Sequence, residues 1–120
     1  MTEAKLWRQL NQLQKSNKNW HFCRIESSTI NGIPDVNACM DGNEFWLELK
    51  ANEAKNYGLS KYQINWHLKH FQNGGQSFIL RECLSQIGAK TLASYQLFVV
   101  REPRHLVLVC DEPKLTDIFK

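Results

Sequence analysis

The sequence predicts an α/β domain in which helices pack against a β-sheet. Near the N-terminus, leucines recur at the spacing of one helix face. Two runs of alternating polar and apolar residues flank the pair Asp41-Gly42, which is a strong signal for a β-hairpin. A second helical segment and several apolar strand segments follow. The 120 residues suffice for one core, so we expect residues 1–120 to form a single domain.

The first helix is expected over residues 3–15, with Thr2 as its N-cap. Its apolar face would carry Leu6, Leu10 and Leu13. The aromatic run WHFCRIE predicts a strand over residues 20–26, and the polar stretch SSTING predicts a loop that leads to Pro34. The hairpin comes next.

The remaining elements follow the hairpin. Ser60 and Gln63 form the Ser-x-x-Gln pattern of a capping box, which predicts the start of a helix. QSFILR, YQLFVVR and HLVLVC predict three strands, and Pro113 opens a short terminal helix. The stretch CLSQIGAKTLAS favours neither helix nor strand.

The turn residues predict the pairing of the hairpin. A type I′ turn at Asp41-Gly42 places Met40 opposite Asn43 and, counting outward, Asp35 opposite Glu48. A three-residue loop with a bulge would shift this register by one residue. In the first register one face is apolar. The other face carries Asp35, Asn37, Glu44, Trp46, Glu48 and Lys50.

Two opposed carboxylates on one sheet face need compensation, because like charges roughly 4.5 to 5.5 Å apart destabilise the ladder. Either one carboxyl of Asp35 and Glu48 is protonated with a raised pKa, or a divalent cation lies between them. Lys50 projects to the same face. A solvated, charged strand face is the simpler alternative. The register favours a Mg²⁺ site with a lysine, a set suited to phosphodiester hydrolysis.

The motifs GIPDV, WLELKA and GLSKYQINWHLKHFQNGG, followed by SFIL, resemble the PD-(D/E)XK nuclease superfamily. Their order and spacing are similar to those of small stand-alone VRR-NUC nucleases, a branch often found in phages and related to Holliday-junction resolvases. The resemblance covers residues 1–82. It implies a restriction-endonuclease-like fold, with a central mixed β-sheet flanked by α-helices.

The resemblance also implies a set of site residues. Asp35 and Glu48 would bind the metal, Lys50 would serve catalysis, and Leu49 would offer its backbone carbonyl to the metal. Glu3 matches a glutamate of the family's first helix, although an acidic residue in a first helical turn is also favoured by the helix dipole.

The second helix is expected to contact both the active site and DNA. Gln63 matches a glutamine that the family places beside the lysine, and it also closes the capping box. The segment from Lys50 to Gly75 is locally basic, so we expect it to hold the DNA backbone. Its candidate DNA contacts are Lys55, Lys61, His67 and Lys69. His67 and His70 lack a third ligand for zinc and are expected to meet phosphate or solvent.

The sequence therefore predicts a Mg²⁺-dependent endonuclease, with Mn²⁺ able to substitute, that is selective for branched DNA and acts as a homodimer. The alternatives are a non-catalytic nucleic-acid-binding module on the same fold and a sequence-specific restriction-type nuclease. The four cysteines form no C-x-x-C pair, and no small-molecule cofactor is expected. No apolar run approaches about 20 residues, so no membrane partner is expected, and the predicted location is the cytoplasm of a bacterial or phage-infected cell.

Overall fold

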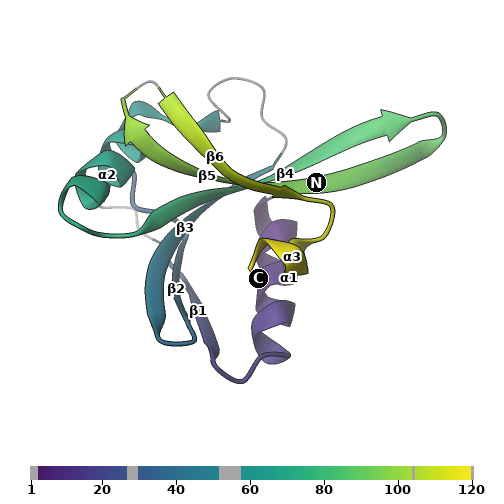
Figure 1. Ribbon diagram of the computed structural model, residues 1–120, viewed down its shortest axis with the longest axis horizontal. Coiled ribbons are helices and arrows are strands. Elements are labelled where there is room, and N and C mark those ends of the chain that lie inside the picture. Colours follow the sequence, from purple (N-terminus) through teal and green to yellow (C-terminus); the bar gives the residue numbers. More distant parts are fainter. Residues whose placement is uncertain (1–2, 27–29, 52–57, 104, 120) are drawn as a thin grey trace.

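One β-sheet runs through the described part of the chain, which comprises residues 3–26, 30–51, 58–103 and 105–119 of a computed structural model. Within these residues, six strands lie in the order β1-β2-β3-β4-β5-β6, and three helices accompany them (Figure 1). The elements along the chain are α1 (Glu3–Lys15), β1 (Trp20–Arg24), β2 (Val36–Met40), β3 (Asn43–Ala51), α2 (Lys61–Gln72), β4 (Ser77–Ile87), β5 (Lys90–Glu102), β6 (His105–Glu112) and α3 (Leu115–Ile118).

The sheet is mixed, because β3 and β4 are parallel while the other neighbouring strands are antiparallel. A parallel pair cannot be joined by a tight turn, so the chain crosses between these two strands through α2. The expected α/β architecture, a central mixed sheet flanked by helices, is confirmed at this level.

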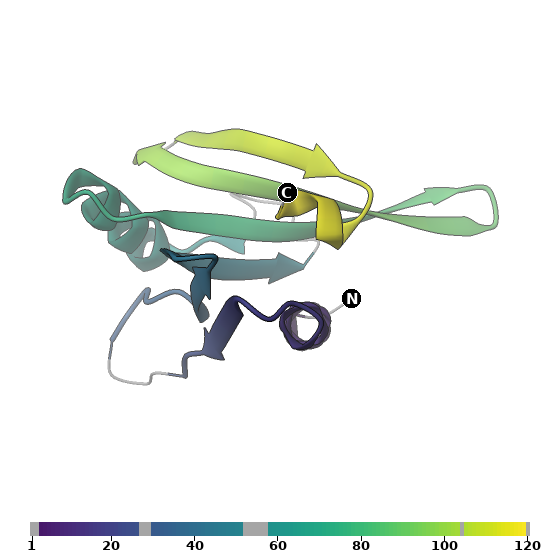
Figure 2. The same cartoon turned by 60° about the horizontal axis from the view of Figure 1, so that its bottom comes forward.

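The helices divide between the two faces of the sheet (Figure 2). The first hydrophobic cluster joins α1 and α3 to the sheet and contains Leu6, Leu10, Leu47, Leu49 and Leu80. The second cluster packs α2 on the opposite face, with Leu59, Ile79, Phe98 and Val100 buried and Ile64 packed against them. Alternation along β3 and β4 sends successive side chains to opposite clusters, so both faces of these central strands are covered.

The β2–β3 hairpin has the predicted register. Met40 lies opposite Asn43, and the pairing continues outward to Val36 opposite Leu47. Asp41 has a φ of 52° and Gly42 a φ of 86°, so both turn residues adopt the positive values that a type I′ turn requires. The bulged alternative is therefore wrong for this hairpin.

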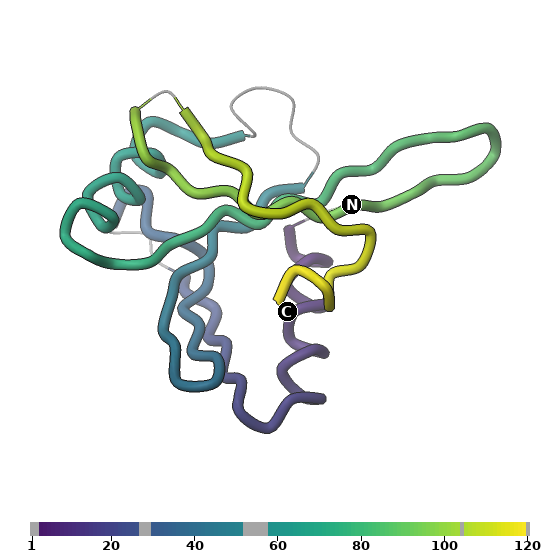
Figure 3. Tube along the Cα trace, in the orientation of Figure 1, coloured from purple at the N-terminus to yellow at the C-terminus, as the bar shows by residue number. Residues whose placement is uncertain are grey.

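The segment CLSQIGAKTLAS, residues 83–94, which favoured neither helix nor strand, forms a long β-hairpin arm. β4 and β5 remain paired as far as Ile87 and Lys90, well beyond the body of the molecule (Figure 3). Ile87 and Leu92 are exposed on this arm, so no buried face imposes an alternating pattern, which explains the weak sequence signal.

Thr2, the expected N-cap of the first helix, lies outside the described residues. No helix in the described ranges has the length and apolar character needed to cross a membrane.

Candidate metal centre

Three carboxylates from separate parts of the chain meet at one point. Glu3 lies in the first turn of α1, Asp35 directly precedes β2, and Glu48 lies in β3. One oxygen from each residue lies within 4.8 Å of the oxygens of the other two. Among the described residues, no other three His, Cys, Asp or Glu side chains lie close enough together to hold one metal ion. The structure thus brings together the three side chains that the sequence proposed as metal ligands.

The backbone of Asp35 is hydrogen-bonded to the chain next to β1, whereas its side chain is hydrogen-bonded to β3. The β2–β3 ladder ends at Val36 and Leu47, so Asp35 and Glu48 do not form the predicted next ladder pair. The Asp35 carbonyl instead accepts a hydrogen bond from the Ile25 N–H at 2.7 Å. Its carboxylate Oδ2 accepts a hydrogen bond from the Leu49 N–H at 2.9 Å. The side chain is therefore fixed toward β3 even though the backbone turns toward β1.

The loop before Asp35 packs tightly on the start of α2. Gly32 has a φ of 83°, and a Cβ at this position would lie 2.3 Å from the Tyr62 carbonyl oxygen. Only glycine combines this left-handed backbone with such a close approach. Gly32 therefore couples the position of Asp35 to the first turn of α2.

Glu48 is a buried acid in an unfavourable environment. Its side chain is 1% exposed, and its Oε1 has no hydrogen-bond partner among the described residues. The pKa of Glu48 is raised to about 10, mainly by burial and then by the hydrogen bond and the negative charge of Asp35. Lys50 opposes this rise, and Glu3 adds a smaller upward effect. At neutral pH this carboxyl stays protonated unless a cation binds to it.

The donor set fits a hard divalent cation. All three side chains offer carboxylate oxygens, which Mg²⁺ and Ca²⁺ prefer, and the unpartnered Glu48 oxygen is available as a ligand. A divalent ion would replace the proton of Glu48 and remove the repulsion among Glu3, Asp35 and Glu48.

Lys50 lies beside this cluster. It is 8% exposed, and its Nζ is 3.8 Å from Glu3 Oε1. It lies two residues beyond Glu48 on β3, on the same side of the strand, as the sequence predicted. Between them, Leu49 contacts Asp35 through its N–H. The expected role of the Leu49 carbonyl as a metal ligand stays a prediction.

Gln63 closes the N-terminus of α2. Its Oε1 accepts a hydrogen bond from the Ser60 N–H at 2.9 Å, while Ser60 Oγ accepts one from the Gln63 N–H at 3.2 Å. The capping box is therefore confirmed. Gln63 also lines a polar pocket of about 600 Å³ together with Asp35, so it lies at the edge of the acidic cluster. Its catalytic role stays a prediction.

Arg24 is a site residue that the sequence reasoning missed. It ends β1 and lines the same pocket as Asp35 and Gln63. Its Nη1 is buried and has no hydrogen-bond partner among the described residues. An unpartnered guanidinium nitrogen in the pocket beside the acidic cluster is suited to bind a phosphate oxygen. No local motif marks Arg24, because only the pairing of β1 with β2 brings it near Asp35.

His67 does not have the predicted exposure to phosphate or solvent. It is completely buried between α2 and β4, where its Nδ1 lies 2.7 Å from Ser77 Oγ. The pKa of His67 is lowered to about 4, mainly by burial and also by the charge of His70, while Asp35 acts in the opposite direction. The ring is neutral at pH 7 and cannot contact DNA in this position. The prediction was wrong because the helical phase that turns His67 toward the sheet is set by packing.

The remaining predicted DNA contacts lie on the exposed side of α2. Lys61 and Lys69 are exposed, and the Lys61 Nζ lies 5.2 Å from the centroid of the Tyr62 ring. Their role in DNA binding stays a prediction. Lys55 lies outside the described residues.

A scan against protein-family models finds no match for this chain, and a search among curated proteins finds no match either.

Proposed function

We propose that this protein is a Mg²⁺-dependent endonuclease that hydrolyses DNA phosphodiester bonds. The observation that carries this proposal is the convergence of Glu3, Asp35 and Glu48, with a lysine beside them. A fold gains no stability from gathering three carboxylates around a buried, unpartnered oxygen, so a functional cation is the economical explanation.

The side chains of the site would have different roles. Glu3, Asp35 and Glu48 would hold the ion, and the Leu49 N–H keeps Asp35 turned toward it. A bound Mg²⁺ would lower the pKa of a coordinated water and stabilise negative charge on the phosphate. Lys50 would orient the attacking water or neutralise the phosphate. Mn²⁺ prefers similar oxygen ligands and should substitute.

Arg24 would hold a phosphate oxygen from the other side of the pocket. It approaches from β1, whereas the acidic residues come from α1, the start of β2 and β3. Gln63, at the start of α2, would contact the same phosphate or its water. The exposed Lys61 and Lys69 would hold neighbouring phosphates, and this contact would be sensitive to salt.

The finer classification belongs to the same proposal. We infer a restriction-endonuclease-like fold and membership of the PD-(D/E)XK superfamily, close to the VRR-NUC and Holliday-junction-resolvase branch. Support comes from the order of the parts: an aspartate before a hairpin strand, Glu-Leu-Lys on its partner, then a helix and a parallel strand. One metal centre cuts one strand, so two-fold dimerisation would permit paired cuts in branched DNA.

The outer edge of β6 supports a homodimer. β6 is the last strand of the described sheet, and Val107, Leu108 and Val109 are all exposed along it. An edge strand with exposed apolar side chains can pair with another copy. Light scattering should give a dimer, and a Leu108→Lys variant should shift it toward monomer without loss of fold.

The decisive experiment compares labelled linear, nicked, flapped and four-way DNA with Mg²⁺, Mn²⁺, Ca²⁺ or EDTA. Cleavage with Mg²⁺ and Mn²⁺, faster on branched DNA, supports the proposal. Ca²⁺ should bind without supporting turnover, because its looser coordination positions the water poorly. Binding of DNA without cleavage under any metal would favour the non-catalytic module instead.

A further inference from the structure

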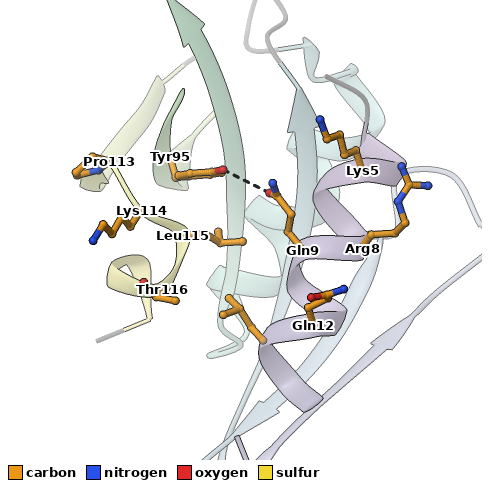
Figure 4. A pocket seen from close by; sticks show the side chains of 10 residues that line it. Lys5, Arg8, Gln9, Gln12, Tyr95, Pro113, Lys114, Leu115 and Thr116 are labelled. Atoms are coloured by element: carbon orange, nitrogen blue, oxygen red, sulfur yellow. Dashed lines mark hydrogen bonds between the residues drawn. The ribbon is translucent and has the colours of Figure 1, made fainter. Parts of the chain in front are cut away.

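A second pocket lies away from the acidic cluster, between α1 and the C-terminal segment (Figure 4). Its volume is about 710 Å³. One wall is the face of α1 that carries Lys5 and Arg8, and the other wall is the segment around Lys114. Across the gap, the Tyr95 hydroxyl donates a hydrogen bond to Gln9 Oε1 at 3.4 Å. The pocket thus has two walls that belong to distant parts of the sequence and are bridged by one polar contact.

The rim of this pocket is cationic. Lys5 and Arg8 lie on the first two turns of α1, and Lys114 lies opposite them before α3. All three side chains are exposed. None of the described residues that line the pocket is acidic. Positive side chains on both walls, with no carboxylate among the described lining residues, favour a ligand with repeated negative charge.

The floor of the pocket is apolar. Leu13 of α1 and Leu115 of α3 line this floor, together with the mostly buried Tyr95 of β5. A cationic rim above an apolar floor matches a nucleotide, whose phosphate would meet the rim and whose base would meet the floor. Bases are available for such a contact only in a single strand, because a duplex presents its phosphates outward and stacks its bases inside.

The pocket also lies next to the candidate metal centre along the chain. Glu3, a member of the acidic cluster, and Lys5, a member of the rim, both belong to the first turn of α1. Leu47 and Leu49 pack with α1 in the first hydrophobic cluster, so the alternating Glu48 side chain points to the other face of the sheet. A strand that leaves the metal centre would therefore reach the rim by passing around the N-terminus of α1, where Glu3 and Lys5 lie.

We propose that the α1–α3 pocket binds a single-stranded segment of DNA next to the cleavage position. The inference rests on the proposed nuclease function and makes its substrate more specific. Branched DNA with a single-stranded arm, such as a flap, is then preferred over a fully paired four-way junction.

The test measures binding of a fluorescent 15-nucleotide oligodeoxythymidylate by anisotropy in EDTA, where no cleavage occurs. The variant Lys5→Gln, Arg8→Gln, Lys114→Gln removes the rim. A matched control, Lys15→Gln, Lys18→Gln, Lys90→Gln, removes the same charge from exposed positions outside the pocket. Circular dichroism and thermal unfolding of both variants check that each one folds.

The rim variant should bind the single strand at least about 10-fold more weakly than the control. Its salt dependence should also be shallower, by about 2 in the log-log slope, because three phosphate contacts contribute about 0.7 each on single strands. An abasic strand of the same length should bind more weakly than the thymidylate strand, since it keeps the phosphates but offers no base to the floor. Flap DNA should be bound more tightly than a four-way junction.

Equal weakening in both triple variants would overturn the inference, because the effect would then come from net charge alone. Equal binding of abasic and thymidylate strands would also overturn it, since the floor would play no part. Displacement by a hexaglutamate peptide at lower concentration than by the oligonucleotide would assign the pocket to an acidic peptide instead. Because every arm contains EDTA, loss of the proposed cleavage activity and loss of this binding are separate results.

Discussion

Glu48 and Glu82 are both buried glutamates on the parallel strands β3 and β4. Glu48 is 1% exposed and Glu82 is 0% exposed, and each has at least one oxygen without a hydrogen-bond partner among the described residues. Burial raises the pKa of both carboxyls. If burial alone identified a functional acid, the two positions would be equivalent.

Their surroundings are different. Glu48 faces two further carboxylates, those of Glu3 and Asp35. Glu82 faces Tyr95 across the β4–β5 ladder, and this hydroxyl and the positive charge of Lys5 partly oppose the rise in its pKa. Three oxygen donors can share a divalent ion, whereas one acid beside a phenol has no second carboxylate with which to complete such a site. The comparison teaches that convergence of ligands, and not burial, distinguishes the candidate metal centre.

The largest expected effect is on cleavage. Asp35→Asn and Glu48→Gln should each slow Mg²⁺-dependent cleavage by about 100-fold or more, because loss of a ligand removes several kcal/mol of transition-state stabilisation. Glu82→Gln should leave the rate within a few-fold of wild type. Initial rates on labelled flap DNA measure this contrast. Wild-type cleavage by a folded Asp35→Asn protein would refute the assignment of the site.

The next effect is on metal-linked stability. At a Mg²⁺ concentration of 100 times its Kd, the wild-type protein should gain about 2.7 kcal/mol, or about 10 °C in Tm. Glu82→Gln should keep this gain, and Glu48→Gln should lose most of it. Thermal unfolding with and without Mg²⁺ measures both variants. An equal gain in all three proteins would place the bound ion elsewhere.

A smaller effect concerns pH in the absence of metal. Both glutamates have a folded-state pKa above the ordinary value of 4.5, so above pH 4.5 the folded protein holds more protons than the unfolded chain. Stability should therefore fall as pH rises, by at most about 1.4 kcal/mol per pH unit for each group. For Glu48 this window extends to about pH 10.

Substitution separates the two contributions. Glu82→Gln and Glu48→Gln should each flatten the decline in Tm between pH 7 and pH 9, because below about pH 6.5 the lowered pKa of His67 acts in the opposite direction. Saturating Mg²⁺ should remove the part that belongs to Glu48 and leave the part that belongs to Glu82, because only Glu48 gains a cation. A pH profile that Mg²⁺ does not change at all would contradict the comparison.

The smallest effect tests whether Gln63 belongs to the Glu48 site or only to the helix end. Ser60→Ala should cost about 1 kcal/mol of stability through loss of the N-cap, with little effect on cleavage. Gln63→Ala breaks the same capping box, so its cost in stability should be similar or smaller. A loss of cleavage in Gln63→Ala but not in Ser60→Ala would assign Gln63 a role beyond the cap, whereas equal rates would confine it to the cap.

Features that depend on neighbouring residues were predictable from the sequence. The Asp41-Gly42 turn specifies the β2–β3 register through its two positive φ angles, and Ser60 and Gln63 mark the start of α2 through a local exchange of hydrogen bonds. The helix at residues 3–15 follows from its leucine spacing. The same turn brings Asp35, directly before β2, close to Glu48 on β3, although Asp35 is held there by the Leu49 N–H and not by the hairpin ladder.

Features that depend on packing between distant segments were not predictable in this way. The burial of His67 depends on which face of α2 meets β4, and the approach of Arg24 to Asp35 depends on the pairing of β1 with β2. The proximity of Lys5 and Lys114 requires α1 and the C-terminal segment to cover the same face of the sheet. A sequence encodes turns and caps within a few residues, whereas these contacts arise only when the hydrophobic faces of all the elements are buried together.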